Sequence, residues 1–179
     1  MTIATATLFA AGIAAFSAAV NLIWRMTSAK DAEARGAHRQ IIQPHLENLG
    51  ECVHAIVATS AILMKTKSDA SLSSWKGKAH KVQATLNLLR PKIRYPLWGL
   101  DEGVRVLIRL PNWTANFKKF PDKAKDLLYI ADRLRWAIDV SVRHSYSYGR
   151  PPVYYERWIV NHYATKMRNT FIEASKRRK

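Results

Sequence analysis

The side chains best suited to chemistry in this chain are cations interleaved with aromatic rings. Between positions 65 and 94 the chain holds eight Lys and Arg residues against one acid, Asp69. Cations neutralise phosphates and flat rings stack on bases, so this mixture predicts a site for single-stranded DNA or another anionic nucleotide ligand. The candidate residues of this basic-aromatic cluster are Trp75, Lys76, Lys78, His80, Lys81, Arg90, Lys92 and Arg94.

Spacing indicates which of these cations can act together. On a helix, Lys78 and Lys81 are surface neighbours, whereas Lys76 points away from both. The alternative interpretation is a solvated helix face with its rings turned inward, and we expect Trp98 and Trp136 to be buried in this way. A second candidate surface holds Arg133, Arg135, Arg143, His144, Tyr146, Tyr148 and Arg150, of which Arg133, Arg135 and Arg143 are the ligand-binding candidates.

No catalytic constellation accompanies these cations. The chain lacks a glycine-rich phosphate loop, a Cys-x-x-Cys pair, an HExxH motif and a G-x-S-x-G motif. His45 and His54 lie near two glutamates and Cys52, but their spacing matches no established metal site. We therefore expect a non-enzymatic protein that uses no cofactor and no metal.

The net charge is strongly positive and unevenly distributed. The chain has 29 Lys and Arg against 13 Asp and Glu, and none of these precedes Arg25, so the whole formal charge of +16 belongs to residues 25–179. Such a charge favours anionic partners, either nucleic acid, a small anion or the anionic lipid of an inner membrane. The basic tail 176–179 suits contact with that lipid.

The elements that must position these residues begin with an uncharged segment, residues 1–24. It is long enough to cross a bilayer core of about 30 Å as a helix. A cleaved signal peptide is one alternative, although the segment lacks the positive n-region of such signals. A soluble helix buried in an oligomer is another. Cations after residue 24 predict a single-pass inner-membrane protein with its N-terminus outside and its body in the cytoplasm. The single cysteine, Cys52, fits a reducing compartment.

One face of this segment is small and polar. Its residues recur at helical spacing and are candidates to line a pore: Thr7, Ala10, Ala14, Ser17 and Asn21. Polar side chains in hydrocarbon are costly unless they face another helix or water. They therefore indicate either contacts between helices or a water-filled pore. Because one helix per chain cannot enclose a pore, the second interpretation requires a homo-oligomer.

The remainder predicts an all-α fold with no strand. We expect a transmembrane helix over 1–24, a polar helical connector over 25–43, a basic helical domain over 44–175 and the tail 176–179. Within the domain, the apolar spacing predicts helices over 44–65, 75–89, 100–110, 121–146 and 153–175, with a Ser-rich loop over 67–74. The expected core residues are Leu46, Leu49, Val53, Ile56, Val57, Ile62 and Leu63 in the first of these helices, and Leu127, Leu128, Ile130, Ala131, Leu134, Ile138 and Val142 in the helix over 121–146.

In overall plan, this layout resembles the membrane channel subunit of the Hailong antiphage defence system. The uncharged helix, the basic helical domain and the expected oligomer carry the resemblance. It implies a tetrameric channel whose cytoplasmic part recognises oligodeoxyadenylate made by a partner nucleotidyltransferase, which holds the channel closed. We therefore expect a homo-oligomeric channel gated by a nucleic-acid-type ligand; the alternative is a membrane-tethered protein that binds nucleic acid or anionic lipid without a pore.

Overall fold

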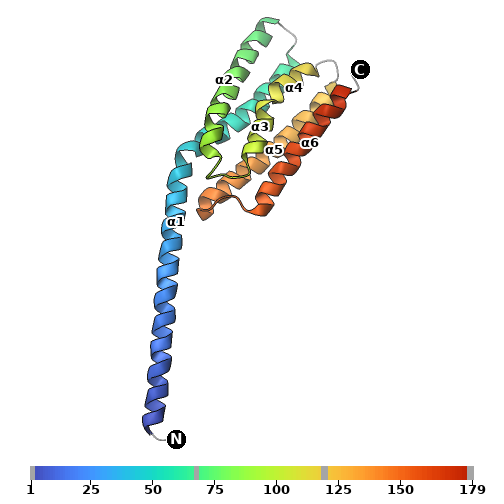
Figure 1. The fold of residues 1–179 in the computed structure, drawn as a ribbon. Coiled ribbons are helices and arrows are strands. Elements are labelled where there is room, and N and C mark those ends of the chain that lie inside the picture. The colour runs from blue at the N-terminus through green and yellow to red at the C-terminus, as the bar shows by residue number, and fades with distance from the viewer. Residues whose placement is uncertain (1–2, 67–68, 118–120, 177–179) are drawn as a thin grey trace. The chain divides into compact units, whose positions relative to one another are not determined.

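A computed structural model of the chain describes residues 3–66, 69–117 and 121–176, without the side chains of residues 3–16, 18, 69 and 70. The described part is all helical and contains no strand (Figure 1). Its elements are α1 (Ile3–Lys65), α2 (Asp69–Ile93), α3 (Asp101–Ile108), α4 (Leu110–Asn116), α5 (Pro121–Tyr148) and α6 (Tyr154–Lys176). The predicted all-α class is confirmed.

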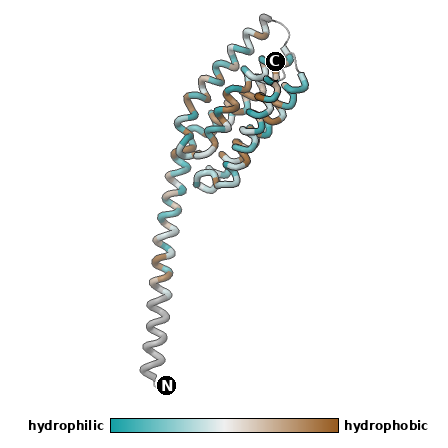
Figure 2. Tube along the Cα trace, turned by 45° about the vertical axis from the view of Figure 1, so that its right-hand side comes forward, coloured by the Kyte–Doolittle hydropathy of each residue, from teal (hydrophilic) through white to brown (hydrophobic). Residues whose placement is uncertain are grey.

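The chain divides into two compact units, Met1–Ala37 and His38–Lys179. The first unit contains only part of α1, and every side chain described between residues 17 and 35 is exposed. Hydrophobic residues follow directly after the part of α1 whose side chains are not described (Figure 2). Among the described residues, no helix combines the length and apolarity of a membrane span. Most side chains of the predicted span 1–24 lie outside the described residues, so the span stays a prediction.

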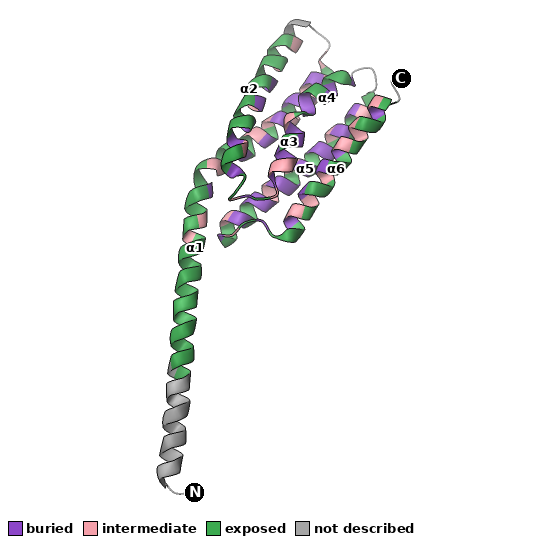
Figure 3. Ribbon diagram, in the orientation of Figure 1, coloured by how far each residue is buried: buried purple, intermediate pink, exposed green. Residues whose placement is uncertain are grey.

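The second unit encloses the hydrophobic core. The C-terminal half of α1 contributes buried side chains to it, and α3, α5 and α6 turn their buried faces toward the same core (Figure 3). Each large side chain that is buried there favours folding by ~1.5–3 kcal/mol. Leu46, Val57, Ile62 and Leu128 were also expected in the core but are only half-buried. The helical spacing predicted burial correctly for the other candidates: Leu49, Val53, Ile56, Leu63, Leu127, Ile130, Ala131, Leu134, Ile138 and Val142.

Several predicted boundaries are wrong. Residues 69–74, expected in a loop, form the first turns of α2, where Leu72 is half-buried, as is Trp75 just after them. The same helix passes through Pro91 to Ile93, and α1 passes through Pro44 without a break. An internal proline costs a helix about 3 kcal/mol. Around Pro44, the burial of Ile42 and Leu49 offsets this cost.

Two side chains at the start of the second unit form hydrogen bonds with the end of α5. His38 Nε2 lies 3.0 Å from Ser145 Oγ. Arg39 donates two hydrogen bonds, from Nε to Tyr146 O at 2.9 Å and from Nη2 to Ser147 O at 2.6 Å. The last carbonyls of a helix have no partner within the helix, and Arg39 donates hydrogen bonds to two of those of α5. Tyr146 O also accepts a backbone hydrogen bond from Gly149 N at 3.1 Å. We call His38 and Arg39 the α1–α5 clamp.

The clamp should make the stability of the fold depend on pH. Burial lowers the pKa of His38 below its usual 6.5, and a hydrogen bond to the backbone of Arg150 acts in the opposite direction. Since the unfolded chain then binds more protons, stability is complete above about pH 6.5 and is lost as the pH falls through the lowered pKa. Urea unfolding at pH 7.5 and 5.5 should show a smaller pH-dependent loss for His38→Gln than for the wild type. Equal losses would contradict the prediction.

Gly103 permits the close packing of α3 on α5 and α6. A Cβ at this position would lie 2.6 Å from Val160 Cγ1 and 3.2 Å from Ile138 Cδ1. The Gly103→Ala substitution should therefore destabilise the fold by ~1–3 kcal/mol, although alanine is the better helix former. Gly77 of α2 is the matched control, because a Cβ there meets nothing within 4 Å. Gly77→Ala should stabilise by up to ~1 kcal/mol in the same urea titration. Destabilisation by both substitutions would show that steric contact is not the cause.

Candidate nucleic-acid interface

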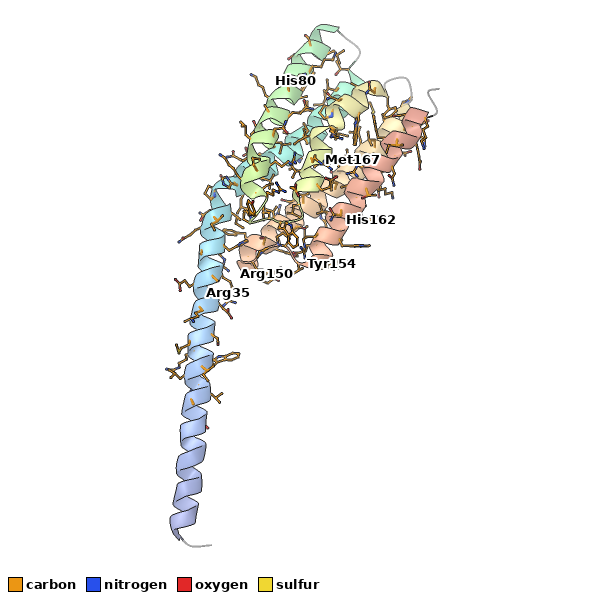
Figure 4. The ribbon with its side chains drawn as sticks, viewed as in Figure 1. Arg35, His80, Arg150, Tyr154, His162 and Met167 are labelled. Carbon is orange, nitrogen blue, oxygen red and sulfur yellow. The ribbon has the colours of Figure 1, made fainter. Side chains whose placement is uncertain are left out.

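The basic-aromatic cluster lies on one helix and the turn that follows it. All its members are within α2 except Arg94, which begins the turn. Trp75 and Arg90 are half-buried, and the other six side chains are exposed: Lys76, Lys78, His80, Lys81, Lys92 and Arg94. His80 is labelled on α2 in Figure 4. The cluster is therefore accessible to a ligand.

Within the cluster, two cations have a defined partner. Arg90 Nε lies 4.0 Å from Asp101 Oδ2. Lys78 Nζ lies 4.0 Å from the centroid of the Trp75 ring, which is a cation–π geometry. Because α2 is continuous here, Lys81 is one turn further on the same side, while Lys76 points away. None of these three lysines forms an ion pair with an acid of the described residues. Their positive charge is available to an anionic ligand.

The second candidate surface is less positive than its sequence indicates. Arg135 Nε lies 2.9 Å from Asp132 Oδ1, and Arg143 Nη2 lies 2.8 Å from Asp139 Oδ2. Arg133 contacts the Tyr129 hydroxyl through two nitrogens at 3.3 Å, and this hydrogen bond raises the pKa of Arg133. Two of the three arginines are thus neutralised by acids on their own helix.

A groove of about 690 Å³ between α1 and α5 includes two of these arginines. Its floor is apolar, with Leu49, Val53 and Ile138 among the lining residues. Its rim carries both signs of charge, since three carboxylates accompany the two guanidinium groups: Glu47, Glu51, Asp139, Arg135 and Arg143. This balance does not favour a polyanion, so α2 remains the stronger of the two predicted surfaces.

The structure corrects the expectation for two tryptophans. Trp98 is 62% exposed and Trp136 is 49% exposed, so neither is a core side chain. Trp98 lies in the turn between α2 and α3, where Gly99 has a φ of +88°. That conformation favours glycine. A Cβ at Gly99 would also lie 2.5 Å from Arg157 Cδ.

Arg157 of α6 packs against this turn. Its guanidinium carbon lies 4.2 Å from the centroid of the Trp98 ring. Its Nε is buried and has no hydrogen-bond partner among the described residues. The contact brings α6 beside the turn that begins at Arg94. Arg157 of α6, which is distant in the sequence, therefore packs against the turn that follows the basic-aromatic cluster.

An aromatic row on α6 was not predicted from the sequence. Tyr155, Trp158 and His162 are all exposed. The ring centroids of Tyr155 and Trp158 are 6.4 Å apart at 17°, and those of Trp158 and His162 are 5.5 Å apart at 25°. His162 is labelled on α6 in Figure 4. The helical spacing of the three rings was the signal that could have revealed this row.

The structure gives less information on the pore-lining candidates and on possible metal ligands. Ser17 and Asn21 are exposed on α1. The side chains of Thr7, Ala10 and Ala14 lie outside the described residues. No group of three His, Cys, Asp or Glu side chains in the described part of the chain could hold a metal ion.

Comparison of the chain with protein-family models, with curated proteins and with solved structures found no match.

Proposed function

We propose that this protein is a homo-oligomeric membrane channel that an anionic, nucleic-acid-type ligand opens or closes by binding to the helical body. The observation that carries the proposal is a row of large apolar side chains on α1, each between 49% and 72% exposed: Val20, Leu22, Ile23, Trp24 and Met26. Burying such a side chain is favourable by ~1.5–3 kcal/mol. A helix with this row, directly after an uncharged segment, is stable where lipid or other copies of the chain cover it.

The flanking residues support an orientation. Trp24 suits the interface between lipid and water, where tryptophan is enriched; Arg25 follows directly, and Lys30 lies within the next two turns of the helix. The proposed span therefore crosses the inner membrane once, with residues 1–24 in the bilayer and the basic body on the cytoplasmic side. Anionic lipid of the inner leaflet would contact the positive body near the membrane.

The polar side of α1 supports the oligomer. Ser17 and Asn21 are exposed in the single chain, and polar groups in hydrocarbon need a polar neighbour. Identical helices arranged in a ring would supply that neighbour and surround a pore. A tetramer of the kind implied by the Hailong resemblance, with a partner nucleotidyltransferase supplying the ligand, is consistent with this plan. We propose an antiphage role on the same basis.

Gating requires that the ligand bind one conformation more tightly than the other. The α1–α5 clamp provides a route for this coupling. His38 directly follows Ala37, the last residue of the first unit, and the helical backbone of α1 is continuous across this position. A ligand that shifted the end of α5 would change the hydrogen bonds that Arg39 makes there.

A membrane-tethered protein without a pore is the second candidate. The exposed lysines of α2 support this candidate as much as they support the channel, because Lys76, Lys78 and Lys81 would bind nucleic acid or anionic lipid in either case. Ion flux separates the two candidates, whereas the salt dependence of binding does not, since both release counterions.

Ion flux through proteoliposomes tests the pore residues. Asn21→Leu should reduce flux by about tenfold or more, because an apolar constriction excludes water from a narrow pore. Ser28→Leu is the matched control, because Ser28 is also an exposed polar residue of α1 but follows the charged boundary at Arg25. It should leave flux unchanged, and both variants should bind oligonucleotide as the wild type does. Equal flux in the two variants would exclude Asn21 from the pore.

A further inference from the structure

The outward face of α6 carries exposed aromatic rings in its first half, and an exposed large aliphatic side chain, Ile172 at 42%, follows only near the end of the helix. The buried residues Val160, Ala164 and Met167 define the inner face of the helix. At 3.6 residues per turn, Tyr155, Trp158 and His162 lie roughly opposite that face. These three rings therefore do not belong to the core, and among the described residues they contact mainly one another.

We propose that this face is a stacking site for the bases of single-stranded nucleic acid. The inference rests on the proposed function for the class of ligand, and it assigns the ligand a site on α6. The near-parallel rings span seven residues, or about 10 Å of helix, which is the length of roughly three stacked nucleotides. Stacking of a base on an aromatic ring is worth ~1–3 kcal/mol and accepts any base.

The residues that continue the row are suited to a nucleic acid. A shallow hollow of about 600 Å³ runs along α6 from Trp158 to Glu173. Its other lining residues are amides, hydroxyls and one ammonium group, which can bond to base edges and phosphates: Asn161, Thr165, Lys166, Asn169 and Thr170. Glu173 at the far end is the one carboxylate of the hollow.

Positive charge lies at the C-terminal end of the aromatic row. Lys166 follows His162 by one turn of the helix, on the same side of α6. Arg157, whose guanidinium stacks on Trp98, lies about 130° around the helix from the row, nearer the buried face. Lys166 is therefore the cation of α6 that a strand stacked on the row could use to contact a phosphate.

A lipid surface is the other class of partner that exposed Trp and Tyr residues can meet. Helices that lie on a membrane combine aromatic with aliphatic side chains on the buried face. In this row the positions after His162 are Thr165, Lys166 and Asn169, which are polar. The composition of the row therefore favours bases over lipid.

The test uses the full-length protein in detergent and two fluorescent 12-nucleotide probes, oligodeoxythymidylate and an abasic strand with the same phosphates. The double substitution Trp158→Ala and His162→Ala should weaken binding of oligodeoxythymidylate about tenfold or more, and should leave binding of the abasic strand unchanged. Trp136→Ala is the matched control, because Trp136 of α5 is 49% exposed and Trp158 is 52% exposed. It should bind both probes as the wild type does.

Three outcomes would overturn the stacking site: equal affinity of wild type and double variant for oligodeoxythymidylate, equal affinity of the wild type for both probes, or a change only in binding to phosphatidylserine vesicles. Other outcomes separate the failure of the stacking site from the failure of the proposed function. If flux is absent but the double variant loses affinity for the bases, the stacking site stands in a protein that is not a channel. If oligodeoxythymidylate alters flux equally in wild type and double variant, the channel stands and the site on α6 is wrong.

Discussion

Removal of residues 1–24 should transfer the protein from the membrane fraction to the soluble fraction almost completely. The body has its own core beginning at Ile42, so it should keep its helical circular dichroism and its unfolding transition. Covering the exposed apolar row of α1 favours the membrane by ~1.5–3 kcal/mol for each large side chain, which over several such residues amounts to a change of many orders of magnitude in partitioning. Sedimentation after a carbonate wash measures this directly.

The matched control for this deletion is removal of the basic tail, residues 176–179. It takes away cationic residues but leaves the apolar row of α1, so the protein should stay in the membrane fraction. A full-length chain that remains in solution without detergent would contradict the membrane assignment. The soluble oligomer, with the N-terminal helices buried against one another, would then be the correct alternative.

Reversing the charge of Lys78 and Lys81 together should weaken oligonucleotide binding about tenfold or more, or ~1.4 kcal/mol. The two side chains are exposed neighbours on α2 and are not paired with a described acid. Loss of two phosphate contacts should also reduce the slope of log affinity against log salt concentration by about 1.4. Fluorescence anisotropy at salt concentrations from about 50 to about 200 mM measures both the affinity and this slope.

The control for this double variant is the charge reversal of Lys176 and Arg177, which changes the net charge by the same amount. A small, uniform decrease in affinity is expected from the altered field of the whole body. If the tail variant loses as much affinity as the Lys78/Lys81 variant, general electrostatic attraction rather than a site on α2 accounts for the binding.

Much of the fold could be predicted because its helices are amphipathic. In α5, Leu127, Leu134 and Ile138 follow the helical period closely, and the predicted helix ends within two residues of Tyr148. The segment 69–74 could not be assigned as easily. Serine is only a moderate helix former, and the half-burial of Leu72 and Trp75 depends on tertiary packing, which a local pattern of serines does not reveal.

The burial of the two tryptophans was predicted wrongly because it was judged from residue type. Helical spacing would have given the correct exposure for Trp136. Trp136 lies two residues from both Leu134 and Ile138, which are buried, so the helical period places it on the opposite side of α5. Trp98 had no such signal. Its position depends on the turn at Gly99 and on Arg157 of α6, and no local pattern connects residues so far apart.

The positions of some candidate residues on their helices could be predicted, whereas their ion pairs could not. The spacing of Lys78 and Lys81 placed them correctly as neighbours on α2, but the ion pairs of Arg135 and Arg143 become visible only in the structure. The row of Tyr155, Trp158 and His162 could have been found from the sequence, because the three- and four-residue steps that separate the rings are helical.

The decisive measurement is ion flux through liposomes that contain the full-length protein while oligodeoxythymidylate is added. The oligonucleotide should raise or lower the flux until the effect saturates, with a midpoint equal to the dissociation constant from anisotropy. In the Lys78→Glu/Lys81→Glu variant this midpoint should shift to higher concentration. No flux at any oligonucleotide concentration, with the oligomer intact by cross-linking, would contradict the channel and leave a membrane-tethered binding protein.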